Sequence, residues 1–215
     1  MAQVELTSLE ELTISEYGRV AQLWVSAHTT QQFWSPEFDI FESLLPPKSS
    51  MVEFGSGGGR DAPRLAQKYR YLGTDRSPEL IQVARKNNPE LSFQQENIYR
   101  MSFLADSFGG FWCSATLLHL PKNRIGEALR EMHRVTKPDV IGFISLKEGY
   151  GQKIERDILF DESGEEIHYD RFVARYQESE FASILTENHF NIIDDKSYVK
   201  PVGNTRWLIF FVKNK

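Results

Sequence analysis

Residues 50–66, which read SMVEFGSGGGRDAPRLA, constrain the fold of this chain more than any other stretch. A short apolar run ends in four glycines among the five residues 55–59, and the chain then resumes with helical spacing. Glycine loses more conformational entropy on folding than any other residue, so this density predicts a backbone that comes very close to something. Glycine-rich turns between a strand and a helix commonly hold a nucleotide-like ligand. Glu53 is an acid placed directly before the turn.

Strands and helices alternate along the middle of the chain. We expect strands at 51–54, 71–75, 91–95, 110–115 and 140–146. The spacing predicts helices between them at 60–69, 77–87 and 124–135. Strands that alternate with helices of roughly 10–15 residues are typical of βαβ units. This pattern predicts a mainly parallel sheet with helices on both faces.

The two ends of the chain differ from this pattern. The first fifty residues read as helical, with Ser8 and Glu11 as a capping box, an amphipathic helix over 15–34, and Ser35 and Pro36 at the start of a further helix. Near the other end, 157–172 read as two extended runs around a Ser-Gly turn. A helix at 177–190 and strands at 191–199 and 206–215 follow. The short connection between these two strands makes them antiparallel neighbours, so the sheet is mixed at one edge.

Composition excludes several classes of protein. The 215 residues carry a formal net charge of -5 and no run of more than two basic residues, which disfavours broad binding to nucleic acid. The N-terminus is acidic and without an apolar segment, and no stretch approaches the roughly 20 apolar residues of a membrane span. Cys113 is the only cysteine, so an intrachain disulfide and a cysteine-rich zinc site are ruled out. We expect a cytoplasmic protein of one domain that binds no metal.

The spacing of the glycines narrows the ligand. A dinucleotide-binding turn has a third glycine three residues after the second, where this chain has Arg60. A phosphate-binding loop that ends in Gly-Lys-Ser/Thr is absent too. The observed pattern is instead Glu53-x-Gly55-x-Gly57-x-Gly59. Both readings that rely on a pyrophosphate are therefore disfavoured.

With these residues the sequence resembles the class I S-adenosylmethionine-dependent methyltransferases. Their first motif is (Asp/Glu)-x-Gly-x-Gly-x-Gly, and the segments GSGGGRDA, GTDRSPELIQVARK and CSATLLHLPK follow the order and spacing of the small-molecule type. The resemblance spans nearly the whole chain. It implies a Rossmann-like, doubly wound α/β fold, with a seven-stranded, mainly parallel sheet, an antiparallel edge strand and an N-terminal helical lid. The chain then divides into a helical cap (1–48), a cofactor-binding core (49–147), a substrate-side hairpin (148–176) and a terminal helix with antiparallel strands (177–215).

The resemblance implies S-adenosylmethionine as cofactor, S-adenosylhomocysteine as product, and a small-molecule acceptor methylated at O or N. Glu53 is expected to accept from the methionine ammonium, while the turn lets the backbone pass the thioether and ribose. Asp75 is expected to accept from the ribose hydroxyls, and its alternative role is that of a helix-start acid. The expected cofactor-binding residues are Glu53, Gly55, Ser56, Gly57, Asp75, Arg76, Asn97, Ile98, Ser114, Tyr17 and Arg60.

Two of these residues carry open alternatives. Asn97 stands where the family has an aspartate that contacts adenine, and its amide oxygen can still accept from the exocyclic amine while Ile98 covers the ring. The alternative for this segment is an ordinary polar loop. Arg60 is expected to pair either with the cofactor carboxylate or with the neighbouring Asp61.

Catalytic residues are less well marked, because methyl transfer needs a base only when the acceptor must lose a proton. His119, His168 and Tyr176 are the candidates. A loop histidine, a polar strand residue and a packing tyrosine, respectively, are the alternatives. Tyr17 resembles a tyrosine that closes over the cofactor in some family members. Phe33 and Trp34 would add an apolar cover, although aromatic residues at helical spacing are more often core.

Three further functions stay open at this point. The first is methylation of a protein or a nucleic acid, and the second is a cofactor-binding regulator without turnover. The third is a dinucleotide-binding protein of the same layered architecture. The size suits a monomer or a weak homodimer, and the acceptor is not determined by the sequence.

Overall fold

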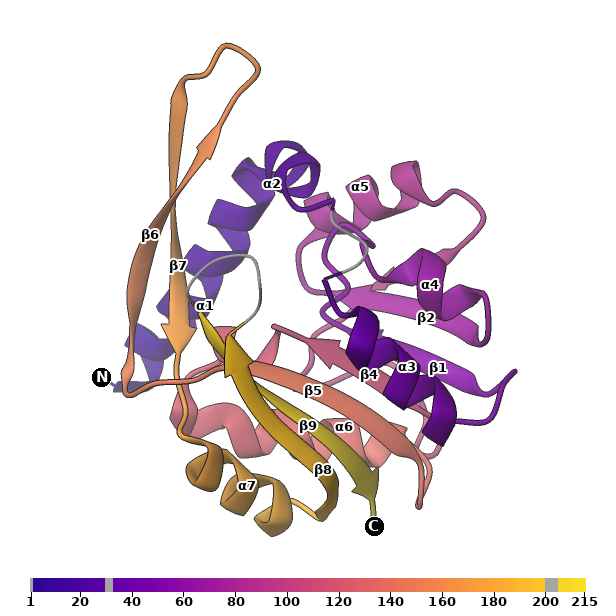
Figure 1. The fold of residues 1–215 in the computed structure, drawn as a ribbon. Helices are drawn as coiled ribbons and strands as arrows, with labels where there is room; N and C mark the ends of the chain where they lie inside the picture. Colours follow the sequence, from indigo (N-terminus) through magenta and orange to yellow (C-terminus); the bar gives the residue numbers. More distant parts are fainter. Residues whose placement is uncertain (1, 30–32, 200–204) are drawn as a thin grey trace.

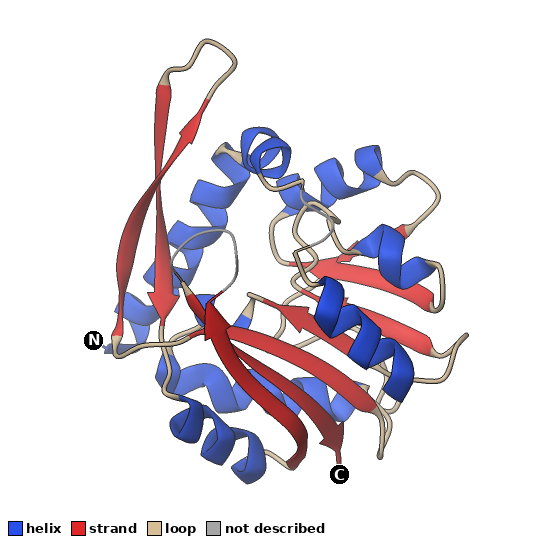
Figure 2. Cartoon of the chain, in the orientation of Figure 1, coloured by secondary structure: helices blue, strands red, loops and turns tan. Residues whose placement is uncertain are grey.

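A seven-stranded sheet forms the centre of the molecule (Figures 1 and 2). The computed structural model describes residues 2–29, 33–199 and 205–215, with the side chains of the first helix described from residue 9 onward. The strand order is β3-β2-β1-β4-β5-β9-β8, and the first five strands run parallel. These parallel strands are β1 (Ser50–Phe54), β2 (Arg70–Asp75), β3 (Ser92–Gln95), β4 (Phe111–Ser114) and β5 (Ile141–Lys147).

Helices cover both faces of the sheet, as the alternating pattern predicted. One face carries α3 (Ser35–Leu44), α4 (Ala62–Ala66) and α5 (Pro78–Asn87), and the other carries α6 (Ile125–Val135) and α7 (Glu178–Glu187) (Figure 1). Ser77 caps α5, because its Oγ accepts from the backbone N–H of Leu80 at 3.2 Å. Two single 3₁₀ turns, Leu117–His119 and Lys122–Arg124, connect β4 to α6.

The mixed edge of the sheet is built from β8 (Phe190–Val199) and β9 (Arg206–Asn214). Strand β9 runs antiparallel to both β5 and β8, and β8 is the outermost strand. The fold class that the sequence predicted is therefore confirmed. The connection over 200–204, which the sequence analysis included, lies outside the described residues.

A separate two-stranded sheet projects from the body of the molecule (Figure 1). Its strands β6 (Gln152–Phe160) and β7 (Glu166–Ala174) are antiparallel neighbours, as the two extended runs around the Ser-Gly turn predicted. Alternate residues of β7 point to opposite sides, so Tyr169 packs inward while His168 is exposed. Strand β7 packs along the first helix, and this places the hairpin beside the carboxyl ends of the parallel strands.

The N-terminal helices differ from expectation at three points. Helix α1 (Ala2–Arg19) begins before Ser8, so the capping box does not start it. The predicted long helix is divided at Val20, and α2 (Ala21–Ala27) follows as a separate helix that packs on α5 and β6. Helix α3 begins at Ser35 itself, and Trp34 occupies the capping position. Helix α4 is also shorter than the predicted 60–69.

The core under the sheet centres on stacked aromatic rings. The indole of Trp112 lies between the rings of Phe38, at 4.5 Å, and Phe143, at 3.7 Å, measured between ring centroids. Cys113, the next residue of β4, is fully buried, and burial raises the pKa of its thiol. The thiol is thus a packing group.

A glycine in β5 provides room for the buried ring of Phe111, and its replacement tests the packing of that ring. Gly142 lies opposite Phe111 of β4, and a Cβ at this position would overlap the phenyl ring. We expect Gly142→Ala to lower the free energy of unfolding by about 1–3 kcal/mol in urea titrations, because overpacking displaces a buried ring. Gly109→Ala is the matched control, since the nearest atom to its added Cβ is 3.5 Å away. Equal stability of the two variants would contradict this account.

Candidate functional site

A cavity of about 520 Å³ opens where the parallel strands end. Its floor comes from the carboxyl ends of β1, β2, β4 and β5, and residues of α1 and α2 contribute its walls. Binding sites in open α/β sheets lie at this edge. Eleven of the residues singled out in the sequence line it: Tyr17, Glu53, Gly55, Ser56, Gly57, Arg60, Asp75, Arg76, Ile98, Ser114 and His119.

The glycine turn after β1 needs its glycines. Gly55 has a φ of +71° and Gly57 a φ of +53°, a region that side chains disfavour. A Cβ at Gly55 would overlap the side chain of Thr116, whose hydroxyl donates to the Phe54 carbonyl at 3.0 Å. A Cβ at Gly57 would overlap nothing, because the nearest atom lies 3.8 Å away on Trp24, at an ordinary contact distance. The bare backbone at Gly57 therefore borders the cavity directly.

The carboxyl of Glu53 is buried at the end of β1 and forms no ion pair within the described ranges of the chain, although the charge of Arg60 acts on it from a greater distance. The residue is 2% exposed, and it accepts a hydrogen bond from the hydroxyl of Tyr71. Burial, with the charge of Asp61 adding to it, raises the pKa of Glu53 well above its usual value. A buried carboxylate facing a cavity is a natural partner for an ammonium group, which would offset both effects.

Asp75 ends β2 beside the glycine turn. Its Oδ2 accepts from the backbone N–H of Gly57 and its Oδ1 from that of Ser77, each at 2.9 Å. The carboxylate thus ties the glycine turn to the start of α5 and also lines the cavity. Both expected roles, helix-start acid and ligand for hydroxyl groups, are compatible with this position, because a carboxylate has about four acceptor sites.

Of the residues that follow β3, some line the cavity and one shapes the local turn. Asn97 does not line the cavity, and its Oδ1 accepts from the backbone N–H of Tyr99 at 3.1 Å. Ile98 and Tyr99 do line it, as does Glu96. The amide that was expected to contact adenine therefore shapes the local turn, as Asn side chains commonly do. Ile98 keeps the expected position for covering a flat ring.

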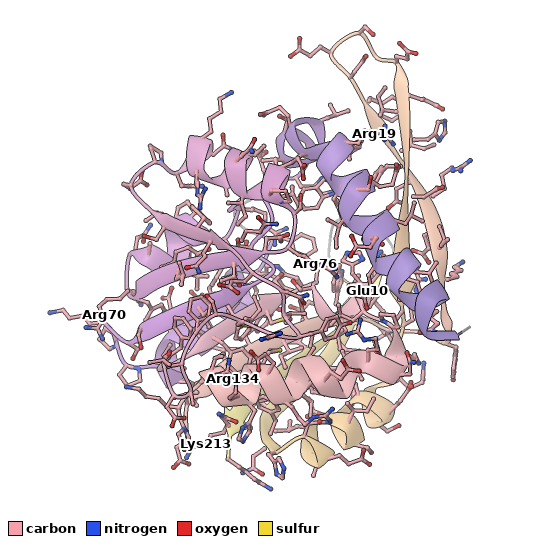
Figure 3. The ribbon with its side chains drawn as sticks, turned by 180° about the vertical axis from the view of Figure 1, so that it is seen from behind. Glu10, Arg19, Arg70, Arg76, Arg134 and Lys213 are labelled. Carbon is pink, nitrogen blue, oxygen red and sulfur yellow. The ribbon has the colours of Figure 1, made fainter. Side chains whose placement is uncertain are left out.

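The two arginines expected at the cofactor have carboxylate partners within the protein. Arg60 binds Asp61 through its Nε at 2.7 Å and its Nη2 at 3.0 Å. Arg76 donates from its Nη1 to Glu10 of α1 at 3.1 Å, and the two side chains point toward each other (Figure 3). Glu10 is buried and also accepts from Arg124 at 3.2 Å. The first helix is thereby held across the cavity by a buried carboxylate with two guanidinium partners.

A chain of hydrogen bonds crosses the other side of the cavity. Arg171 Nη1 donates to the hydroxyl of Tyr17 at 3.2 Å, and that hydroxyl lies 3.2 Å from Nε2 of His119. The other ring nitrogen of His119, Nδ1, lies 2.8 Å from the carbonyl of Phe172. Because a carbonyl only accepts, Nδ1 carries the proton and Nε2 accepts from Tyr17. Burial, with repulsion from Arg171, lowers the pKa of His119 to about 3, so the ring is neutral.

Ser56 and Ser114 occupy the ends of β1 and β4. The backbone N–H of Ser56 donates to the carbonyl of Thr74 at 2.7 Å, which holds the glycine turn against β2. The hydroxyl of Ser114 is buried, and no hydrogen-bond partner reaches it among the described residues. Such a group is usually satisfied by a ligand or an ordered water.

Two of the three catalytic candidates lie outside the cavity. His168 is on the exposed side of β7, where its Nε2 is 3.5 Å from Glu166. Tyr176 is fully buried next to Phe181, with Lys122 Nζ 4.4 Å above its ring. The alternation of β7 explains the first position and core packing explains the second. We therefore assign neither residue a role in the site.

The structure adds residues that the sequence analysis did not single out. Lys147 lies at the carboxyl end of β5 and Arg171 in the hairpin, and both line the cavity with the aromatic rings of Trp24, His28 and Trp207. The position of Lys147 could have been predicted from the sequence, because it ends a parallel strand. Asp75 also ends its strand, and Glu53 is the last residue but one of β1. Arg171 could not, because no sequence pattern tells where an inserted hairpin packs.

A family model matches the segment of the chain that holds β1 to β4. Residues 51–139 match the model of a methyltransferase domain family. The matched stretch runs from β1 to the turn after α6, so it contains the glycine turn, Asp75 and the loop after β4. No curated protein matches the chain.

Solved structures agree in fold over nearly the whole chain. An S-adenosylmethionine-dependent methyltransferase from Methanosarcina mazei is 21% identical, with a TM-score of 0.69, covering 81% of this chain and 96% of its own. A 1,6-didemethyltoxoflavin-N1-methyltransferase from Burkholderia thailandensis with bound S-adenosylhomocysteine is 18% identical, with a TM-score of 0.76, covering 98% and 90%. The 4+2 cyclase SpnF is 14% identical, with a TM-score of 0.71, covering 92% and 94%. At these identities the likeness shows the fold alone.

Neither a membrane-crossing helix nor a metal-binding cluster occurs among the described residues. No helix there is both long and apolar enough to cross a membrane. No cluster of three or more His, Cys, Asp or Glu side chains in the same ranges is placed to hold a metal ion.

The neutral state of His119 predicts a pH dependence of stability. The ring has a pKa of about 3 in the folded chain and an ordinary pKa of about 6.5 in the unfolded chain. Between these two pH values only the unfolded chain takes up the proton. Stability from this group is present above about pH 6.5 and is lost as the pH falls. When the pH falls from 7 to 5, we expect the free energy of unfolding of His119→Gln to decrease by about 1–2 kcal/mol less than that of the parent protein. Urea titrations at the two pH values measure this difference.

The exposed His168 provides the matched control for this measurement. His168→Gln removes a half-exposed imidazole and so controls for the substitution itself. An unchanged pH dependence in His119→Gln would show that the imidazole is not held neutral by its burial.

Proposed function

We propose that this chain, which carries the domain and the fold of the class I S-adenosylmethionine-dependent methyltransferases as its sequence predicted, transfers a methyl group to an O or N atom of a small molecule. The observation that carries the proposal is the buried carboxyl of Glu53, which forms no ion pair in the described chain and lines the same cavity as Asp75. S-adenosylmethionine offers an ammonium for the first carboxylate and ribose hydroxyls for the second.

The residues of the cavity fit this cofactor in three respects. The backbone at Gly57 lines the cavity without a side chain, which lets a ligand group approach it. The buried hydroxyl of Ser114, without a partner among the described residues, can bond to a polar group of the methionine part. Ile98 supplies an apolar surface for the adenine ring. The same fit does not favour a dinucleotide, because a carboxylate at Glu53 would repel a pyrophosphate.

The reaction asks little of the protein beyond placement. When bound, S-adenosylmethionine supplies an electrophilic methyl group on a good, neutral leaving group. The protein has to hold an acceptor atom in line with that methyl group and exclude water. Trp24, Trp34 and Trp207 line the cavity and can exclude water there. His119 keeps its proton on Nδ1 and its Nε2 engaged by Tyr17, which suits an orienting role better than that of a base.

Turnover separates this proposal from a binding protein without activity. Purified protein incubated with methyl-labelled S-adenosylmethionine and a metabolite extract should transfer label to a small molecule. Binding of S-adenosylhomocysteine without transfer of label to any extract would favour the regulator. Transfer to the protein fraction or to nucleic acid would contradict a small-molecule acceptor.

The carboxylate of Asp75 provides the first test of the cofactor site. We expect Asp75→Ala to weaken the binding of S-adenosylhomocysteine by about 1–3 kcal/mol in a calorimetric titration, because buried charge-assisted hydrogen bonds are lost. Asp195→Ala, on the exposed edge strand β8, should leave the affinity unchanged. If the affinity of Asp75→Ala equals that of the parent, Asp75 serves only as a helix-start acid.

The ion pairs that Glu10 of the first helix forms with Arg76 and Arg124 provide a second test. Glu10 is 3% exposed and Glu11 has a side chain that is 56% exposed, yet both pair with Arg76. We expect Glu10→Gln to weaken S-adenosylhomocysteine binding about tenfold, because the cover over the cavity loosens when its buried ion pairs are lost. Glu11→Gln should change the affinity less than about twofold, since exposed pairs contribute little. Equal effects of the two substitutions would contradict a covering role for α1.

A further inference from the structure

We propose that the methyl acceptor is an aromatic acid whose carboxylate is bound by Lys147 and Arg171. The inference rests on the proposed methyl transfer and adds the chemical class of the acceptor. The two cations come from different elements, the end of β5 and the hairpin strand β7, and meet in the wall of one cavity. The positive charges of both side chains lower the pKa of His119, so the two cations lie on the same side of the cavity as this ring.

The carboxylates that accompany these cations do not line the cavity. Arg171 pairs with Asp157, and Arg175 pairs with Glu155. Lys153 also lies 3.8 Å from Glu155, so that carboxylate is already shared. The corresponding distance from Lys147 Nζ to Glu155 is 4.0 Å, the limit of an ion pair. Four cations therefore share two carboxylates. The excess positive charge faces the cavity through Lys147 and Arg171, which line it.

Both cations are only partly satisfied within the described chain. The Nε of Arg171 is buried, and no hydrogen-bond acceptor reaches it among the described residues. The side chain of Lys147 is 11% exposed, and burial, with repulsion from Arg171, lowers the pKa of its ammonium to about 8. Two like charges in a sheltered wall are costly unless an anion joins them. A guanidinium beside an ammonium provides the fork of donors that suits a carboxylate.

The neighbouring wall is aromatic, which indicates the rest of the acceptor. Trp207 lies directly opposite Lys147 across the β5–β9 ladder. Its indole contacts that of Trp34, with ring centroids 5.3 Å apart, and the ring of Phe33, with centroids 5.9 Å apart. All three side chains line the cavity. A flat ring lying on this wall would carry its carboxylate next to Lys147.

The test compares two probes of the same shape that differ in charge. Benzoate and its neutral isostere benzamide are titrated calorimetrically into the protein, with and without saturating S-adenosylhomocysteine. We expect benzoate to bind about tenfold or more tightly than benzamide in both conditions, because both cations belong to the chain. Lys147→Met should reduce this preference to about twofold or less. The matched control Lys153→Met, whose side chain is 69% exposed outside the cavity, should retain the full preference.

A pH series on the parent protein provides a measurement that needs no variant. The charges around Lys147 are the cations Arg171 and Arg175 and the carboxylates Glu155 and Asp157. Benzoate affinity should be constant below about pH 7 and fall as the pH rises through about 8, where Lys147 loses its proton, while benzamide affinity should stay constant.

The outcomes separate this inference from the proposed function. Equal binding of the two probes, undetectable binding of benzoate, or a preference that persists in Lys147→Met would overturn the carboxylate site. Failure of S-adenosylhomocysteine to bind would overturn the cofactor assignment instead. The benzoate preference measured without that ligand would still decide the carboxylate site.

Discussion

The parallel alignment of β1, β2, β4 and β5 is the constraint on which the site depends. Parallel strands end at the same edge, so Glu53, Asp75, Ser114 and Lys147 meet there although the chain separates them widely. The edge is polar and sheltered at once, because α1, α2 and the hairpin rise beside it. A buried carboxyl on one side and two buried cations on the other therefore face a common space.

This division of charge gives the cavity two chemically different halves. Glu53 and Asp75 suit a ligand with donors, such as an ammonium and ribose hydroxyls. Lys147 and Arg171 suit an anion, and the aromatic wall beside them suits a flat ring. Neutral His119, hydrogen-bonded to Tyr17, lies beside the two cations without adding charge. An electrostatically divided pocket of this kind orients two different molecules toward each other before any reaction begins.

The segments that cover the cavity are held by buried ion pairs. Glu10 connects α1 to Arg76 after β2 and to Arg124 before α6. The carboxylate of Glu16 accepts from the backbone N–H of Asp170 at 3.2 Å, which joins the same helix to the hairpin. Because these pairs bridge distant parts of the chain, the cover and the cofactor edge form one connected structure. Movement of α1 would open both halves of the cavity together.

Local signals determined the parallel half of this protein. The glycines at 55 and 57, the serine cap at Ser77 and the alternating strands and helices each act within a few residues, so their consequences could be predicted from the sequence. What the tertiary structure decided depends on packing between distant segments. Arg171 reaches the cavity only because β7 packs along α1, and it meets Lys147 of β5 there. No local pattern encodes such contacts, since they arise from the apolar faces that the folded elements bury against one another.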